Sequence, residues 1–135
     1  MLAHLPIPLW LNEGLAVNME QSITRLPQFR LTKEKQVKHQ QFWQEKEVQE
    51  FWAGTSFSRP DQGNELSYQL AQLIVLSLSE DYERFAQFVN TANFSDAGEA
   101  AAIEVYGGSI GAVIHQYFGE GARSPNPVEW ESNES

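Results

Sequence analysis

Apolar residues recur at helical spacing along almost the whole chain. In residues 65–79 they occupy nearly every side of the predicted helix, which is typical of a helix that is buried all round. We therefore predict that this segment is the central core helix and that Asn64 caps its start. No segment shows the strict alternation of a half-buried strand, although an edge hairpin near residues 56–59 stays open as an alternative.

The other helices are predicted from shorter apolar stripes and from residues that start or stop a helix. Pro8 suits a first helical turn, Thr32 and Ser109 suit N-caps, and Gly54 suits a helix end. With the core helix, the predicted helices cover residues 8–21, 33–45, 46–52, 65–79, 80–91, 97–106 and 110–118. The helix of residues 33–45 is the most polar, and Val37 and Phe42 are its predicted apolar anchors.

These elements predict an all-α fold, a compact bundle of five to seven helices packed around residues 65–79. The 135 residues are enough for one domain with a real core, which we place in residues 1–119, followed by a flexible acidic tail in residues 120–135. Gly14 lies inside the first predicted helix, where glycine costs up to about 1 kcal/mol relative to alanine. We attribute it to another stretch of backbone that passes close by.

Charge and composition exclude several partners. The formal net charge of −9 disfavours nucleic acid and anionic membrane surfaces, and the only lysine cluster is Lys33, Lys35 and Lys38. No apolar run approaches the roughly 18 residues of a membrane span. The absence of cysteine removes disulfides and thiol chemistry. The first residues lack the features of a signal peptide, so we expect a cytoplasmic protein if Met1 is the true start. That expectation fails if the true start lies upstream.

The sequence of residues 10–16, Trp-Leu-Asn-Glu-Gly-Leu-Ala, resembles the signature of gluzincin zinc peptidases, the group that includes alanyl aminopeptidases and peptidase MA-like domains. The resemblance implies the C-terminal helical half of such a domain and extends over residues 6–118. It also implies that Glu13 is the third protein ligand of a catalytic zinc, whose first two ligands are histidines of an HExxH helix earlier in the chain. The order of weaker elements agrees with the family in residues 51–57, 68–73, 85–89 and 99–109.

This chain contains no HExxH motif, and that bears directly on Glu13. A catalytic zinc takes three protein ligands and an open position, whereas the histidines here are His4, His39 and His115, none of them paired at the four-residue spacing. His4 lies close enough in sequence to approach Glu13, but two ligands make a weak site. We therefore expect no cofactor in this chain, and we interpret Glu13 as a remnant carboxylate held by local hydrogen bonds.

The neighbours of the motif have both functional and structural interpretations. In the family Asn12 supports the helix or the substrate side, and a tyrosine in the position of Tyr68 stabilises the oxyanion. As structural residues, Asn12 is a partly exposed helix residue, Trp10 a core residue, and Tyr68 a core tyrosine with a hydrated hydroxyl. The acidic residues outside the motif are interpreted as solvated helix faces and first-turn charges: Glu45, Glu47, Glu50, Glu80, Asp81 and Glu83.

Three functional hypotheses follow. The first is a catalytically inactive, peptidase-like domain that acts by protein–protein contact. The second is the C-terminal part of a longer zinc metallopeptidase whose HExxH half is not in this chain. The third and weakest is a hydrolase of another class. Without an HExxH helix beside it, the apolar side of residues 9–19 should lack a neighbour, and a large exposed apolar patch usually marks an interface. We therefore expect a homodimer or a partner protein that covers the Glu13 helix.

Overall fold

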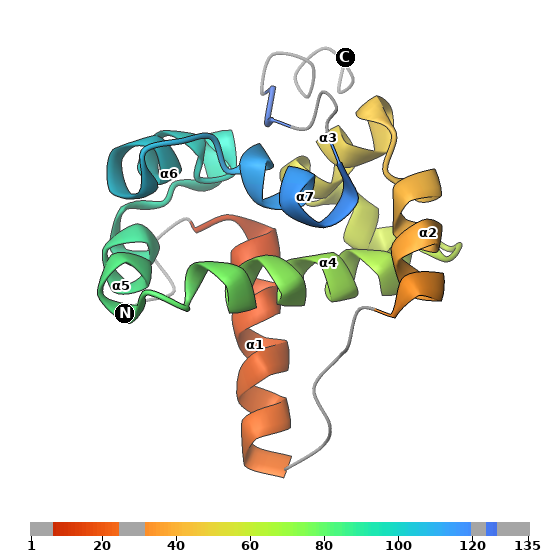
Figure 1. Ribbon diagram of the computed structural model, residues 1–135, viewed down its shortest axis with the longest axis horizontal. Helices are drawn as coiled ribbons and strands as arrows, with labels where there is room; N and C mark the ends of the chain where they lie inside the picture. The colour runs from red at the N-terminus through yellow and green to blue at the C-terminus, as the bar shows by residue number, and fades with distance from the viewer. Residues whose placement is uncertain (1–6, 25–31, 120–123, 127–135) are drawn as a thin grey trace.

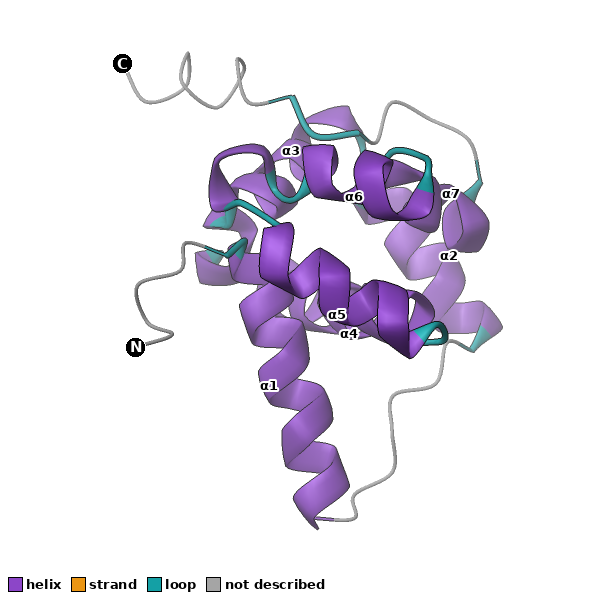
Figure 2. Ribbon diagram, turned by 90° about the vertical axis from the view of Figure 1, so that its left-hand side faces the viewer, coloured by secondary structure: helices purple, strands orange, loops and turns teal. Residues whose placement is uncertain are grey.

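The described part of the chain, residues 7–24, 32–119 and 124–126, is all α-helical in a computed structural model. The order of its elements is α1 (Leu9–Thr24), α2 (Lys33–Phe42), α3 (Glu45–Ala53), η2 (Thr55–Ser58), α4 (Gly63–Leu78), α5 (Tyr82–Thr91), η3 (Phe94–Asp96), α6 (Glu99–Tyr106) and α7 (Gly111–Phe118). Figure 2 shows these helices joined by loops, with no strand in the described residues. The all-α prediction is confirmed.

Helix α4 is the centre of the bundle, as its sequence predicts. Buried residues lie on several sides of it, among them Leu66, Leu70 and Ile74. Figure 1 shows α1 crossing α4 and then extending beyond the other described helices. The first half of α1 therefore belongs to the core, while its second half projects from the bundle.

Gly14 lies where α1 meets α4, and its position explains why the helix contains a glycine. A Cβ atom added there would come within 2.8 Å of the carbonyl oxygen of Ala71 and 2.7 Å of Cγ2 of Val75. Real Cβ contacts are never this short, so only glycine lets the two helices approach this closely. The prediction of a close backbone at Gly14 is confirmed.

Local sequence predicts some helix ends and misses others. Thr32 accepts a hydrogen bond from the Lys35 amide at 3.2 Å and Gly54 ends α3 with φ +93°, both as predicted. Ser109 accepts from the Gly111 amide at 3.1 Å, but the N-cap position of α7 belongs to Ile110, one residue later than predicted. The cap assigned to Asn64 is wrong, because its side chain turns back to the Phe57 carbonyl and Asp61 instead accepts from the Gly63 amide at 2.9 Å.

Two further predictions need correction. The possible edge hairpin at residues 56–59 is the 3₁₀ helix η2, which continues the chain beyond Gly54 without any strand. Val37 is not an anchor of α2, because 43% of its surface is exposed; the fully buried residue of that helix is His39. The spacing of apolar residues could not identify His39 as the buried anchor of α2, because His39 is itself polar.

Most of the predicted tail lies outside the described residues, but one piece of residues 120–135 is placed. The buried Gln49 on α3 donates to the Ser124 carbonyl at 2.8 Å and accepts from the Asn126 amide at 2.7 Å. The Ser124 hydroxyl also lies 2.6 Å from the Ser109 hydroxyl. Residues 124–126 are therefore attached to the bundle at α3 and at the start of α7.

Candidate functional site

The residues that resemble the peptidase signature all lie on the first half of α1. One side of this helix is buried against the bundle, and the opposite side is exposed. Trp10, Leu11 and Gly14 are buried against the bundle. Leu9, Asn12 and Ala16 are exposed on the opposite side, and Glu13 is half-buried at its edge. We call the side formed by Leu9, Asn12, Glu13 and Ala16 the Glu13 face.

Trp10 fixes the start of α1 in the core, so its predicted structural role is confirmed. Its indole ring lies 5.8 Å from Trp52 in an edge-to-face arrangement and 6.1 Å from Phe88, measured between ring centroids. Its Nε1–H donates a buried hydrogen bond of 3.0 Å to the carbonyl oxygen of Ala97. Ala97 has an unusual φ of +57°, so this bond joins the motif helix to a tightly turned loop 87 positions later.

That local hydrogen bonds hold the Glu13 carboxylate stays a prediction. A remnant carboxylate held by local hydrogen bonds would have a donor nearby, and within the described residues no hydrogen bond or ion pair to the Glu13 carboxylate is found. Partly buried carboxylates are normally satisfied by donors, because burial without a partner costs free energy. The carboxylate of Glu13 is thus held in place by its helix, without a donor from the described part of the chain.

The predicted bare apolar side of residues 9–19 is not present in residues 9–16, and Val17 and Met19 lie outside the residues whose side chains are described. The large apolar residues Trp10 and Leu11 are fully buried, and Leu9 is the large one that remains exposed, with 40% of its surface accessible. The helices α3 and α4 cover the apolar side because Gly14 allows α1 to pack closely. The Glu13 face that stays open is mixed in character rather than a large apolar patch.

Tyr68 lies on the side of α4 that faces α1. It precedes Ala71 by three positions and Val75 by seven, and residues at these spacings share one face of a helix; Ala71 and Val75 are the residues that meet Gly14. Its half-buried ring packs edge-to-face on Phe57, with the centroids 5.1 Å apart. No hydrogen bond to its hydroxyl is found among the described residues. Tyr68 and Glu13 therefore both lie within a helical turn of the same crossing.

The histidines do not gather around Glu13 in the described part of the chain. His4 lies outside the described residues. His39 is buried between α2, α4 and α7, and His115 is half-buried on α7. The described residues contain no group of three or more His, Cys, Asp or Glu side chains placed to hold a metal ion. None of the described helices has the length and apolar character needed to cross a membrane.

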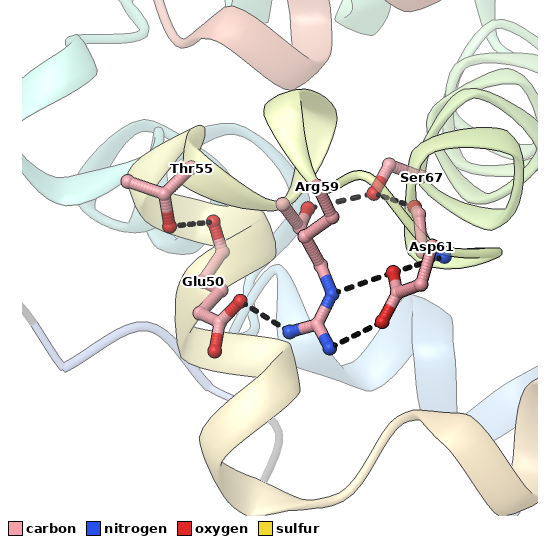
Figure 3. A network of polar contacts seen from close by, with 7 residues as sticks. Glu50, Thr55, Arg59, Asp61 and Ser67 are labelled. Carbon is pink, nitrogen blue, oxygen red and sulfur yellow. Dashed lines mark hydrogen bonds and ion pairs between the residues drawn. The ribbon is translucent and has the colours of Figure 1, made fainter.

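One acidic cluster is more than a solvated surface. Figure 3 shows the Arg59 guanidinium between Glu50 and Asp61, with an Nη1–Oε1 distance of 2.7 Å to Glu50 and an Nη2–Oδ2 distance of 2.8 Å to Asp61. The Arg59 hydrogen bonds lower the pKa of Asp61 to about 2, with a further contribution from the Gly63 amide. The sequence analysis missed this cluster because its members come from α3 and from the loop before α4.

The remaining acidic residues mostly cap helices or lie at the surface. Asp81 accepts from the Arg84 amide at 3.2 Å and caps α5, which begins two residues later than the predicted range of 80–91. Glu45 and Glu47 are in the first turn of α3, as predicted. Glu99 accepts from the Ile110 amide at 2.8 Å and joins α6 to the start of α7. None of these residues shares a site with Glu13.

Comparison with models of protein families, with curated proteins and with solved structures finds no match to this chain. The resemblance of residues 10–16 to gluzincin peptidases therefore stays a prediction. It depends on the sequence of those residues and is neither supported nor opposed by any relative.

Proposed function

We propose that this chain is a peptidase-like helical domain that acts through protein–protein contact at the Glu13 face of α1. The observation that carries the proposal is the half-buried Glu13 carboxylate, for which no donor is found in the described part of the chain. A partner that brings an N–H or cationic group to this face would satisfy that carboxylate. It would also cover Leu9, whose surface is 40% exposed.

The charge of the chain favours a different protein over a second copy. A two-fold contact at this face would bring two copies of Glu13 close together in molecules that each carry a formal net charge of −9. Like charges in close contact are unfavourable. A homodimer thus stays as the alternative, and light scattering at high protein concentration separates the two, because only self-association raises the mass of the purified chain.

The contact is tested by photo-crosslinking from the Glu13 face in the native source. A crosslinking amino acid at the exposed Ala16 should capture a defined partner, and Glu13→Lys should abolish that capture. Glu104→Lys, which makes the same charge change at an exposed position on α6, should leave it unchanged. Equal capture with both variants would contradict the proposal.

A second candidate is the C-terminal part of a longer zinc metallopeptidase. In that case Glu13 is one zinc ligand, and an HExxH segment that is not in this chain supplies the two histidines. The finding that no described residue donates to the Glu13 carboxylate favours it, because a zinc ligand must be available to the metal. The described residues do not by themselves fit a zinc centre, since they offer Glu13 alone where catalytic zinc takes three protein ligands. We therefore assign no reaction step to this chain.

Intact mass and metal content of the native protein distinguish the two candidates. A product that begins at Met1 and carries no stoichiometric zinc supports the contact domain. A longer product with zinc at one equivalent, lost on Glu13→Ala and kept in Glu104→Ala, supports the metallopeptidase. Peptidase activity insensitive to chelator would instead support the third hypothesis of a hydrolase of another class.

A further inference from the structure

The buried His39 is bonded at both of its ring nitrogens, at Nδ1 to Trp43, the residue that ends α2, and at Nε2 to Gln69 on α4. Nδ1 lies 2.9 Å from Nε1 of Trp43, and Nε2 lies 2.9 Å from Oε1 of Gln69 on α4. The imidazole also stacks on Phe118 of α7, with centroids 5.2 Å apart and ring planes 7° apart. Three helices therefore meet at one titratable side chain that is fully buried.

The hydrogen bonds fix the neutral state of His39. The indole N–H of Trp43 can only donate, so Nδ1 must accept and the single ring proton lies on Nε2, from which it donates to Gln69. A proton added at Nδ1 would face the Trp43 N–H, and two donors cannot pair. Protonation thus breaks the Trp43 bond and leaves a charge in a buried position, which costs free energy.

Few other contacts hold α2 in place. Within Lys33–Phe42 the fully buried residue is His39, and the apolar Val37 is exposed. The same face of the helix carries Gln36 and Gln40, whose side-chain amides donate to the Tyr117 and Phe118 carbonyls at 2.7 and 3.4 Å. A helix of ten residues is not stable alone in water. The attachment of α2 therefore depends on this polar face together with Phe42, which is partly buried against the core.

Some neighbours of His39 lower its pKa further, and others raise it. Burial lowers the pKa of His39 most, the Gln69 hydrogen bond raises it, and Lys38 and Lys35 on α2 lower it further, while Glu65 on α4 raises it. Helix α7 contributes Phe118 to the contact, and its titratable residues are His115 and Tyr117.

We propose that α2 is an acid-released element, which detaches from α4 and α7 when His39 takes up a proton. This inference is independent of the proposed function. Because the pKa of folded His39 is lowered from 6.5, stability is complete above that value and falls as the pH drops from 6.5 toward the folded pKa. If His39 binds a proton only when α2 is released, the equilibrium constant for opening rises by up to about tenfold for each pH unit in that window.

Hydrogen exchange of the whole chain at pH 7.5 and 5.5, corrected for intrinsic rates, tests the proposal. We expect the protection of Lys33–Phe42 to fall on acidification, and to fall by up to about tenfold less in His39→Gln. Glutamine can accept from Trp43 and donate to Gln69 but cannot titrate. His115→Gln, at the half-buried histidine of α7, is the matched control and should behave as wild type.

A second measurement keeps the test valid if His39→Gln does not fold. The His39 ring resonances of the wild-type chain should not titrate near pH 6.5 while α2 is protected. In Trp43→Phe, which removes the opposing donor, the loss of α2 protection between pH 7.5 and 5.5 should be smaller. A His39 ring that titrates at about 6.5 with α2 protection unchanged, or equal pH dependence in wild type and His39→Gln, overturns the proposal.

Discussion

Glu13 and Glu50 are both partly buried helix carboxylates, yet their surroundings are opposite. The Glu50 side chain is 25% exposed and pairs with Arg59 at 2.7 Å, within a cluster that also holds Asp61. Glu13 is half-buried on α1, and no donor to its carboxylate is found in the described part of the chain. The fold uses the carboxylate of Glu50, whereas no described residue uses that of Glu13.

Among the described residues, the contacts that position Glu13 are those of its helix backbone rather than of a side-chain partner. Its helix is held on one side by the contact of Gly14 with α4 and at its start by the hydrogen bond from Trp10 to the Ala97 carbonyl. At the Arg59 cluster the reverse holds, because there the side chains fix a loop. A carboxylate held only through its backbone can accept a ligand without first breaking an existing bond.

The largest expected effect comes from disturbing the backbone support of Glu13. Gly14→Leu must push α1 away from the Ala71 carbonyl, which lies 2.8 Å from the position of a Cβ atom. Overpacking of this kind costs about 1–3 kcal/mol, occasionally more, and urea unfolding should show it as a lower midpoint. Ala16→Leu, on the exposed side of the same helix, should change the unfolding free energy by less than about 0.5 kcal/mol.

Equal costs for Gly14→Leu and Ala16→Leu would show that the α1–α4 contact is not what positions Glu13. The contrast between Glu13, positioned through its helix, and Glu50, positioned by Arg59, would then no longer hold.

The same two regions explain how much the sequence could predict. Helix positions and some caps follow from local patterns, because Thr32 and Gly54 act on backbone groups only a few residues away. The close approach at Gly14 was also predictable, since glycine inside an amphipathic helix needs a reason. The partner helix α4 was identified separately as the apolar core.

Contacts between distant residues were beyond the sequence. Nothing near Trp10 indicates that its indole reaches Ala97, and no apolar stripe marks His39 as the buried residue of α2. The cluster around Arg59 depends on the path of the loop before α4. For the candidate site, the sequence suggested Glu13 and Tyr68 by resemblance, but it could not show that no described residue donates to the Glu13 carboxylate.

A smaller effect is expected from removing Arg59, the cation that pairs with Glu50 and Asp61. Arg59→Met keeps most of the packing on Phe42, over which the guanidinium lies at 5.1 Å, but leaves Glu50 and Asp61 without their counter-ion. We expect a small loss of stability at neutral pH, because ion pairs at a protein surface contribute little. Thermal unfolding at low and high salt measures it, and the loss should shrink as salt screens the pair.

The pH dependence gives a second test of that cluster. The pKa of Asp61 is lowered to about 2, so its contribution is complete above the unfolded value near 3.8 and is lost as the pH falls toward 2. In Arg59→Met the pKa of Asp61 should rise, and the acid-dependent loss of stability between pH 4 and 2 should become shallower. An unchanged acid profile would mean that Asp61 is held by the Gly63 amide rather than by Arg59.

The smallest expected effect is the most informative about Glu13. Glu13→Gln keeps the shape of the side chain and removes its charge, and it should change the unfolding free energy by less than about 0.5 kcal/mol. Glu50→Gln makes the same chemical change where the carboxylate is paired, and it should cost more because Arg59 then loses an ion pair. If Glu13→Gln is instead the more costly of the two in urea unfolding, Glu13 has a structural partner after all, and the interpretation as a remnant held by hydrogen bonds would replace that of an available carboxylate. If Glu13→Gln leaves the unfolding free energy unchanged, the charge at position 13 contributes little to folding. Its role must then be sought in what the Glu13 face binds.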